Sequence, residues 1–243
     1  MNKQFIRIGR FIGNDNLEKL FASTVAIVGI GAVGGFATEM LARCGIGHII
    51  IMDFDTVSES NINRQIIALH STVGRFKTDV MKERILDINP ACVIEDYPVQ
   101  LTDENHELLF SSDIILDCID SVDAKVSLLS DAWKSGKRII SSMGAALRKD
   151  TSLITTADIM DTYGCPLAKS VRTKLRKNGC GKGIECVFSP EAVDFSYKKA
   201  DEDEEAESGE SGRKRMVLGS LPYVTAVFGE KMAEMAINKL LAL

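Results

Sequence analysis

The chain has 243 residues, of which 45% are hydrophobic, so it carries enough apolar material for one large domain. Its formal net charge of −5 does not exclude an RNA partner, because the run DEDEEAESGE at 201–210 concentrates acids in one place. The sequence has neither a signal peptide nor an apolar run long enough to cross a bilayer, and its six cysteines form no CxxC pair. We therefore expect a cytoplasmic protein with reduced thiols, without a zinc site and without a membrane contact.

The N-terminal segment places two arginines, Arg7 and Arg10, among apolar residues. NDNLEKLFA at 14–22 then predicts a short helix. The next stretch, TVAIVGIGAVGGF at 24–36, predicts a strand over 24–29, a glycine turn, and a helix from about 32 to 44.

The glycine turn has the spacing of a phosphate-binding loop. Gly29 would make the tight bend, Gly31 would let a phosphate approach the backbone, and Gly34 would let the helix pack close to the strand. Free N–H groups at the helix start favour an anion. We therefore predict a nucleotide phosphate site here, against the alternative of a tight turn without a ligand.

A polar cluster follows the second predicted strand, HIIIMDFD at 48–55. Asp53 closes that strand, where this fold class places an acid against ribose hydroxyls, although a turn or helix-cap acid is the alternative. The segment also contains Asp55, Asn61, Arg64 and Gln65. Arg64 would neutralise developing phosphate charge and Asn61 would orient it, so the cluster favours a triphosphate-handling chemistry over a plain polar loop.

Two further candidates come from the next elements. The pattern predicts a helix over 71–89, with Lys77 near its start, where a lysine is electrostatically unfavourable unless it faces phosphates; a surface lysine is the alternative. Strands are predicted at 92–98, 113–118 and 138–143, with helices at 103–110 and 121–135. Asp120 follows the strand 113–118, where it would hold Mg²⁺ on a triphosphate or cap the next helix.

The organisation changes after residue 150. We expect an extended segment at 151–158, a basic stretch at 164–182, a strand at 184–189 that contains Cys186, a mobile acidic loop near 194–215, and a helix over about 222–241. The basic stretch is either a solvated helix face or an RNA phosphate contact.

The fold class is α/β: one Rossmann-like, doubly wound, mainly parallel sheet in a single domain 1–243, with a nucleotide-binding core at about 5–145 and a C-terminal elaboration at about 150–243.

Four segments together identify a family. GIGAVG at 29–34, DFDTVSESNINRQ at 53–65, VGRFK at 73–77 and DCIDS at 117–121 stand in one order and spacing. With them, the chain resembles the ubiquitin-activating-type adenylating enzymes, a superfamily that includes enzymes that adenylate sulfur-carrier proteins. The second half resembles one branch, the tRNA threonylcarbamoyladenosine dehydratases, in CPLAKSVRTKLR at 165–176, GIECVFSPE at 183–191, KRM at 214–216 and GSLPYVTAVFG at 219–229.

The resemblance implies ATP and Mg²⁺ as cofactors and a tRNA carrying threonylcarbamoyladenosine as substrate, contacted by the basic stretch. It implies that the three glycines cradle ATP, that Asp53 holds the ribose, that Asn61, Arg64 and Lys77 hold the phosphates, and that Asp120 holds Mg²⁺. Asp55 and Gln65 belong to the same nucleotide-binding set. The family is also a homodimer in which an N-terminal arginine reaches the partner's site, which implies Arg7, with Arg10 as second choice.

Other functions stay open at this stage. An enzyme that adenylates the Gly-Gly end of a small sulfur carrier would share the ATP site and would use a sulfur-transfer protein partner. A nicotinamide dehydrogenase would use the glycines and Asp53 but would leave Asn61, Arg64, Lys77 and Asp120 without a role, and a binding module would use them without turnover. Distant relatives use a cysteine in the second half as an acyl acceptor; we expect Cys186 to be a buried strand cysteine instead.

Overall fold

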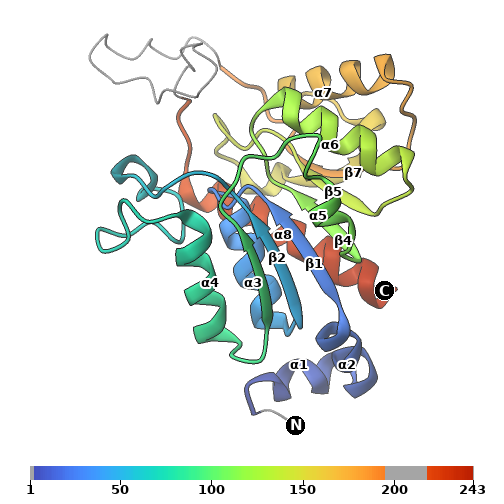
Figure 1. The fold of residues 1–243 in the computed structure, drawn as a ribbon. Helices are drawn as coiled ribbons and strands as arrows, with labels where there is room; N and C mark the ends of the chain where they lie inside the picture. Colours follow the sequence, from blue (N-terminus) through green and yellow to red (C-terminus); the bar gives the residue numbers. More distant parts are fainter. Residues whose placement is uncertain (1–2, 195–217, 243) are drawn as a thin grey trace.

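A computed structural model describes residues 3–194 and 218–242. Its centre is a seven-stranded sheet with the order β3-β2-β1-β4-β5-β7-β6 (Figure 1). The strands are β1 (Thr24–Val28), β2 (His48–Met52), β3 (Val93–Tyr97), β4 (Ile114–Asp117), β5 (Ile139–Ser142), β6 (Thr155–Asp158) and β7 (Glu185–Phe188). All neighbouring pairs are parallel except β6 with β7. This confirms the predicted α/β class with a doubly wound, mainly parallel sheet.

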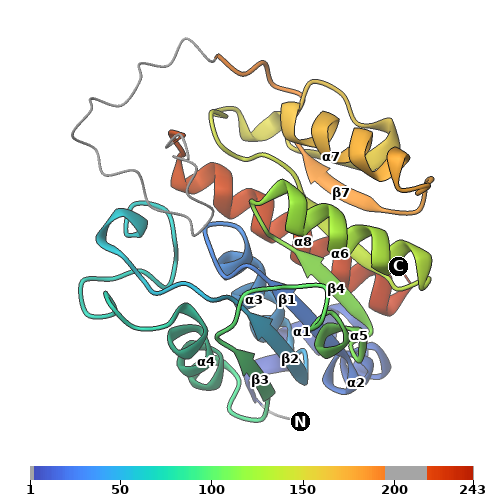
Figure 2. The ribbon, with the colours of Figure 1, turned by 45° about the horizontal axis from the view of Figure 1, so that its top comes forward.

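The helices lie on both faces of the sheet (Figure 2). They are α1 (Ile6–Ile12), α2 (Asn14–Ala22), α3 (Gly34–Cys44), α4 (Lys77–Ile88), α5 (Glu107–Phe110), α6 (Val122–Lys134), α7 (Pro166–Lys177) and α8 (Pro222–Leu241). Four 3-10 turns accompany them, at η1 (Lys3–Phe5), η2 (Glu59–Asn61), η3 (Thr151–Leu153) and η4 (Ile159–Asp161). No helix in the described part of the chain has the length and apolar character needed to cross a membrane.

The strands feed two separate cores because successive side chains point to opposite faces. In β1, Val25 and Ile27 belong to the core shared with α3, α4 and α8, whereas Ala26 and Val28 belong to the core shared with α6 and α7. Nearly all of these side chains are fully buried. The continuous apolar runs of β1, β2 and β4 are therefore explained by burial on both faces.

The strand order puts the switch point of the sheet between β1 and β4. The chain leaves β1 toward β2 and β3 on one side, and continues on the other side with β4 and β5. In such sheets ligands bind beyond the carboxyl ends of the strands at this point. The glycine turn follows β1, and the DCIDS segment follows β4, so both lie at this edge.

The C-terminal helix covers the first βα unit. A Cβ placed on Gly229 of α8 would lie 2.5 Å from the carbonyl oxygen of Val33 and 2.8 Å from Cβ of Phe36. Glycine at this position therefore lets α8 cross directly over the start of α3. The predicted helix at about 222–241 is confirmed, and it completes the core on the α3 side.

Several local predictions were wrong in detail. The helix expected at 103–110 begins only at Glu107, because residues 103–106 form turns. The helix expected over 71–89 begins only at Lys77, because residues 71–76 form turns and an isolated bridge joins Thr56 to Phe76. The extended segment at 151–158 begins with the turn η3, so only Thr155–Asp158 is a strand. The N-terminal segment forms helix α1, for which no element was predicted. The acidic run and most of the expected loop at 194–215 lie outside the described residues.

Candidate nucleotide-binding site

The glycine turn after β1 is shaped by close backbone contacts. Gly29 has φ +86°, and a Cβ there would lie 2.8 Å from the carbonyl oxygen of Cys118. A Cβ on Gly34 would lie 1.9 Å from the carbonyl oxygen of Gly29. Packing therefore requires glycine at both positions. This agrees with the roles predicted for Gly29 in the tight turn and for Gly34 in the packing of the helix on the strand.

Gly31 differs from the other two glycines. The nearest atom to a Cβ placed on it would be Nε2 of Gln65, at 3.9 Å, so the space above Gly31 is open. No packing contact of the kind found at Gly29 and Gly34 requires glycine here. The open backbone suits a ligand that comes close to it, as a phosphate does in loops of this spacing.

Asp53 directly follows β2 and is tied to the glycine turn. Its Oδ2 accepts a hydrogen bond from the backbone N–H of Ile30 at 2.6 Å, and its Oδ1 accepts one from Asp55 N–H at 2.9 Å. Burial raises the pKa of this carboxyl, against the opposing effects of Lys77 and of the two hydrogen bonds. Asp53 thus fixes the shape of the turn, in addition to any contact with a ribose.

Lys77 stands at the first position of α4, with its side chain only 6% exposed. Its Nζ lies 2.6 Å from Oδ2 of Asp55, which is half exposed. The backbone N–H of Lys77 also donates to the carbonyl oxygen of Asp55 at 3.0 Å. A buried ammonium at a helix N-terminus is costly unless anions surround it. The position therefore favours the phosphate-facing alternative over a surface lysine.

The remaining residues of the cluster lie on the turn that contains η2. Asn61 is buried, and its Oδ1 accepts from Ser58 N–H at 3.2 Å in a capping box, so it holds the turn. Arg64 is partly exposed, and its Nη1 donates to the carbonyl oxygen of Ser60 at 2.7 Å. Gln65 is buried with its Oε1 unpaired among the described residues, beside the open space at Gly31. A hydroxyl donor from a ligand would satisfy that oxygen.

Asp120 is exposed in the loop between β4 and α6, at the same edge of the sheet. The next residue, Ser121, occupies the N-cap position of α6 without a side-chain capping bond. Asp120 thus lies beyond the carboxyl end of β4, at the same edge as the glycine turn, and its assignment to Mg²⁺ stays a prediction.

One group of residues behind this loop was not predicted. Lys125 of α6 is fully buried, and its Nζ lies 2.6 Å from Oδ2 of Asp117, 3.0 Å from the carbonyl oxygen of Ser142 and 3.2 Å from Oγ of Ser141. Asp117 also accepts from Ile119 N–H at 3.1 Å, which holds the start of the DCIDS loop. In the sequence, this group was signalled only by the position of Asp117 at a strand end. From its position on α6 alone, Lys125 would be predicted to be an ordinary surface lysine.

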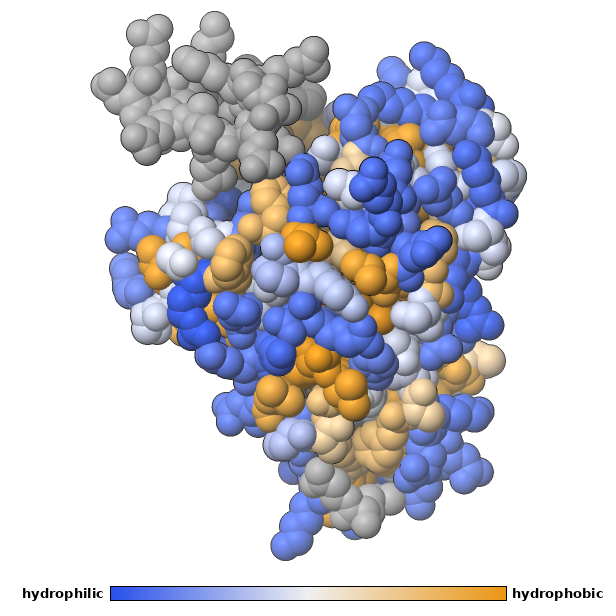
Figure 3. Space-filling view, viewed as in Figure 1, coloured by the Kyte–Doolittle hydropathy of each residue, from blue (hydrophilic) through white to orange (hydrophobic). Residues whose placement is uncertain are grey.

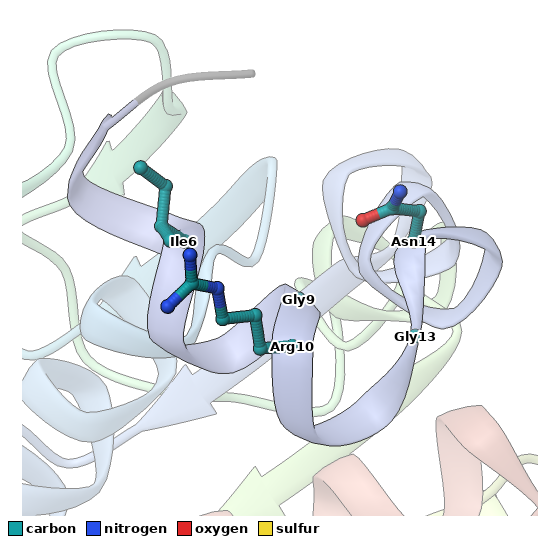
Figure 4. A pocket seen from close by; sticks show the side chains of 5 residues that line it. All are labelled: Ile6, Gly9, Arg10, Gly13 and Asn14. Atoms are coloured by element: carbon teal, nitrogen blue, oxygen red, sulfur yellow. The ribbon is translucent and has the colours of Figure 1, made fainter.

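The two N-terminal arginines lie beyond the amino ends of the central strands, on the side of the sheet opposite the glycine turn. Phe5, just before α1, packs near Gly45 at the end of α3, and Gln4 Nε2 donates to the carbonyl oxygen of Ile88 at the end of α4. Figure 4 shows Arg10 beside Ile6 in a surface depression between α1 and α2, lined also by Gly9, Gly13 and Asn14. Arg7 and Arg10 are both exposed. A strand of five residues spans about 17 Å, so neither arginine is brought to the glycine turn of its own chain.

The basic stretch at 164–182 is largely helix α7, under a hydrophilic surface (Figure 3). Arg172 turns inward, with Nη1 donating to the carbonyl oxygen of Thr162 at 2.7 Å. Lys174 pairs with Asp123, and Lys182 pairs with Asp161. The bases left exposed and without an ion pair among the described residues are Lys169, Arg176 and Lys177. The contact surface is thus smaller than the sequence count of bases suggests.

Cys186 lies in β7 and has no exposed surface. Burial raises the pKa of its thiol to about 12. Only the thiolate is a nucleophile, so the thiol is inert in this state. The expectation of a buried strand cysteine is confirmed.

Comparison with known proteins gives a consistent family. The ThiF family model matches residues 3–243. A tRNA threonylcarbamoyladenosine dehydratase of Bacillus subtilis is 45% identical over 194 residues, which cover 79% of this chain and 76% of the relative. The structure of E. coli tRNA N6-threonylcarbamoyladenosine dehydratase in complex with ATP has a TM-score of 0.86 and 32% identity, and covers 99% of this chain and 94% of that one.

The other branch of the superfamily gives a shorter match. An adenylyltransferase and sulfurtransferase UBA4 of Eremothecium gossypii is 37% identical over 159 residues, which cover 65% of this chain and 36% of the relative. The dehydratases, in contrast, match through the second half of the chain. The chain belongs to the ThiF family and, within it, to the tRNA threonylcarbamoyladenosine dehydratases.

Proposed function

We propose that this chain is an ATP-dependent tRNA threonylcarbamoyladenosine dehydratase. It would adenylate the carboxylate of the modified nucleoside, which then closes to a cyclic form with net loss of one water. The observation that carries the proposal is that the likeness to the dehydratases runs through both halves of the chain, including α7, β7 and α8. The site at the glycine turn would supply the ATP chemistry that this reaction needs.

The residues at the glycine turn fit a nucleotide. Gly31 leaves open space at the backbone, and the buried ammonium of Lys77, which pairs with Asp55, would also attract phosphates. The oxygen of Gln65, unpaired among the described residues, would accept from a hydroxyl. Asp53 would hold the ribose, and Asn61 and Arg64 would complete the phosphate contacts. Both internal hydrogen bonds of Arg64 are donated by Nη1, so a phosphate oxygen would bind the guanidinium through Nη2.

The chemistry follows from the leaving group. A carboxylate is a poor electrophile because oxide cannot leave, whereas an acyl adenylate loses AMP readily. The carboxylate oxygen attacks the α-phosphorus and pyrophosphate leaves; a nitrogen already in the substrate then attacks the acyl carbon, loses its proton and expels AMP. The residues of the site hold the reacting groups together and stabilise phosphate charge, so no protein nucleophile is required.

The proposal includes three parts that concern assembly and cofactor. Mg²⁺ would be held by Asp120 and would neutralise charge on the triphosphate. The chain would act as a homodimer, because Arg7, with Arg10 as second choice, lies at the far edge of its own sheet and would reach the site of a second copy. The whole chain would act as one domain in the cytoplasm, where its tRNA substrate is found.

The RNA surface would centre on the exposed bases of α7. Lys169, Arg176 and Lys177 are available for phosphate contacts, whereas Arg172 is committed to Thr162. Each phosphate contact releases counterions, so tRNA binding should weaken as salt rises, with a slope of about −0.7 to −0.9 per contact. Lys169→Ala and Arg176→Ala together should reduce that slope, and Arg172→Ala should act mainly on stability.

The alternative within the superfamily is adenylation of the Gly-Gly end of a small sulfur carrier, with a sulfur-transfer protein as partner. It would use the same ATP site. It is less favoured because the likeness to that branch is confined to a shorter part of the chain.

The test is ATP–pyrophosphate exchange with three acceptors: tRNA that carries threonylcarbamoyladenosine, tRNA that lacks it, and a Gly-Gly-ended carrier protein. Mass analysis of the digested nucleosides runs alongside. Exchange with the modified tRNA only, and an ATP-dependent loss of one water from its modified nucleoside, is the expected result. Exchange driven by the carrier alone would move the chain to the sulfur-transfer branch.

A further inference from the structure

Arg148 is a buried cation that the site described above does not use. It is 2% exposed, and its Nε and Nη1 atoms are buried without a hydrogen-bond partner among the described residues. A guanidinium stays charged at any physiological pH, so it cannot escape burial by losing its proton. A buried charge without acceptors is strongly unfavourable. The arrangement therefore calls for an anion that is not part of the described chain.

The loop that carries Arg148 is fixed on both sides. Leu147 has φ 58°, a left-handed conformation that is uncommon for leucine, and its N–H donates to the carbonyl oxygen of Gly219 at 2.9 Å. The carboxylate of Glu191 accepts from the N–H groups of Lys149 and Asp150, each at 3.1 Å. The backbone around Arg148 is thus anchored, and the guanidinium stays buried without an ion pair in the part of the chain that the structure describes.

The position of this loop relates it to the nucleotide-binding site. It follows β5, which is parallel to β4, so it leaves the sheet at the same edge as the glycine turn and the DCIDS loop. Tyr223, in the first turn of α8, donates from its hydroxyl to the carbonyl oxygen of Lys149 at 3.4 Å. Gly229 of the same helix packs on Val33 beside the glycine turn. Six residues of helix span about 9 Å, so α8 connects the loop that carries Arg148 to the start of the glycine turn.

We propose that Arg148 is an oxyanion subsite for the tRNA substrate, beside the nucleotide-binding site. This inference rests on the proposed function for the identity of the substrate. The bound group is a carboxylate or a phosphate, and the substrate offers both: the threonyl carboxylate of the modified nucleoside and the phosphates of the neighbouring backbone. Charge-assisted hydrogen bonds from Nε and Nη1 would supply the contact.

The binding experiment compares Arg148→Met and Arg148→Gln with Lys149→Met, which removes an exposed positive charge from the next residue. ATP affinity should be the same in all of them. If the carboxylate is bound, the Arg148 variants should bind modified tRNA at least tenfold more weakly and unmodified tRNA normally. If a phosphate is bound, both tRNAs should weaken by the same factor, and the salt slope should fall by about one. Wild-type affinity of both variants for both tRNAs would overturn the proposal.

A stability experiment separates a binding role from a structural one. Without ligands, Arg148→Met should melt at or above the wild-type temperature, because it removes an uncompensated charge. With saturating ATP present, inorganic phosphate should raise the melting temperature of the wild type and of Lys149→Met but not of Arg148→Met. A less stable Arg148→Met with unchanged tRNA binding would make Arg148 structural and the proposal wrong.

The two proposals fail in different ways. If the wild type cyclises no tRNA, the proposed function fails, whereas the phosphate-dependent melting shift still reports on Arg148. If the wild type cyclises tRNA but the phosphate shift and both tRNA affinities are unchanged in Arg148→Met, the subsite fails and the dehydratase function stands.

Discussion

The ammonium of Lys125 lies 2.6 Å from Oδ2 of Asp117, and neither side chain has any exposed surface. This pair joins α6 to the end of β4 and sits directly behind the loop that carries Asp120. Asp117 Oδ2 also accepts from Ser141 Oγ at 2.5 Å, so the pair is part of a satisfied buried network. Such a network holds its surroundings in one arrangement, and it is costly to break in part.

Lys125→Met should therefore destabilise the protein by about 3–5 kcal/mol, because it leaves the carboxylate of Asp117 buried without its counter-charge. The double variant Lys125→Met, Asp117→Asn should lose less than the single one. Denaturant unfolding of the wild type, of both single variants, Lys125→Met and Asp117→Asn, and of the double variant measures these losses. A loss in the double variant equal to the sum of the two single losses would show that the two charges do not compensate each other.

Gly31 and Gly34 should respond differently to alanine. Gly34→Ala places a methyl group 1.9 Å from the carbonyl oxygen of Gly29, so this variant should fold poorly or not at all. Gly31→Ala has its nearest neighbour at 3.9 Å and should stay within about 0.5 kcal/mol of wild-type stability. It should nevertheless bind ATP at least tenfold more weakly, as measured by calorimetry. Normal ATP affinity in this variant would show that no phosphate of ATP binds above Gly31.

Lys77 should matter for the rate of adenylation. Lys77→Met should slow ATP–pyrophosphate exchange by about 10²–10³-fold, the usual loss for one preorganised charge-stabilising donor. Arg75→Met is the matched control, since Arg75 lies on the same segment and pairs with Glu83 at 2.5 Å on the surface, where solvent screens the interaction. Similar exchange rates in Lys77→Met and Arg75→Met would show that Lys77 has only a structural role.

Glu39 gives a prediction about pH. Burial raises the pKa of this carboxyl, but Arg84 and Arg43 outweigh burial, so the net pKa is lowered. An acid whose folded pKa is lowered contributes stability above its unfolded pKa, and this contribution is lost as pH falls through the folded value. Glu39→Gln should therefore cost about 1–3 kcal/mol near pH 7 and progressively less as the pH falls below the ordinary pKa of a glutamate. A cost that does not depend on pH would exclude the charge as its source.

Cys186 should be dispensable for the chemistry. Cys186→Ala should keep most of the dehydratase activity, because the thiol is buried in β7 and its pKa is raised to about 12. In the folded wild type, Cys186 should stay unmodified by a thiol reagent at pH 8, as peptide mass mapping would show. Complete loss of activity in a normally folded Cys186→Ala would instead make it an acyl acceptor.

The sequence was most informative where function is encoded locally. The glycine spacing and the segment from Asp53 to Gln65 predicted an edge of the sheet that the fold does assemble, since each is a short stretch next to a strand end. Lys125 and Arg148 were missed because their surroundings come from distant parts of the chain. The strand partners of Lys125 and the segments beside Arg148 become neighbours only in the fold. Burial of a charge is a tertiary property, and no local pattern reports it.

The packing of α8 on α3 has a consequence for synthesis. A chain made from its N-terminus forms β1 and the glycine turn early, but α8 is the last of the described elements. Until α8 arrives, the apolar face of α3 that it covers, including Ala37 and Leu41, has no partner from this helix. The nascent chain would therefore carry an unfinished nucleotide-binding unit during most of its translation, which makes this face a target for chaperones.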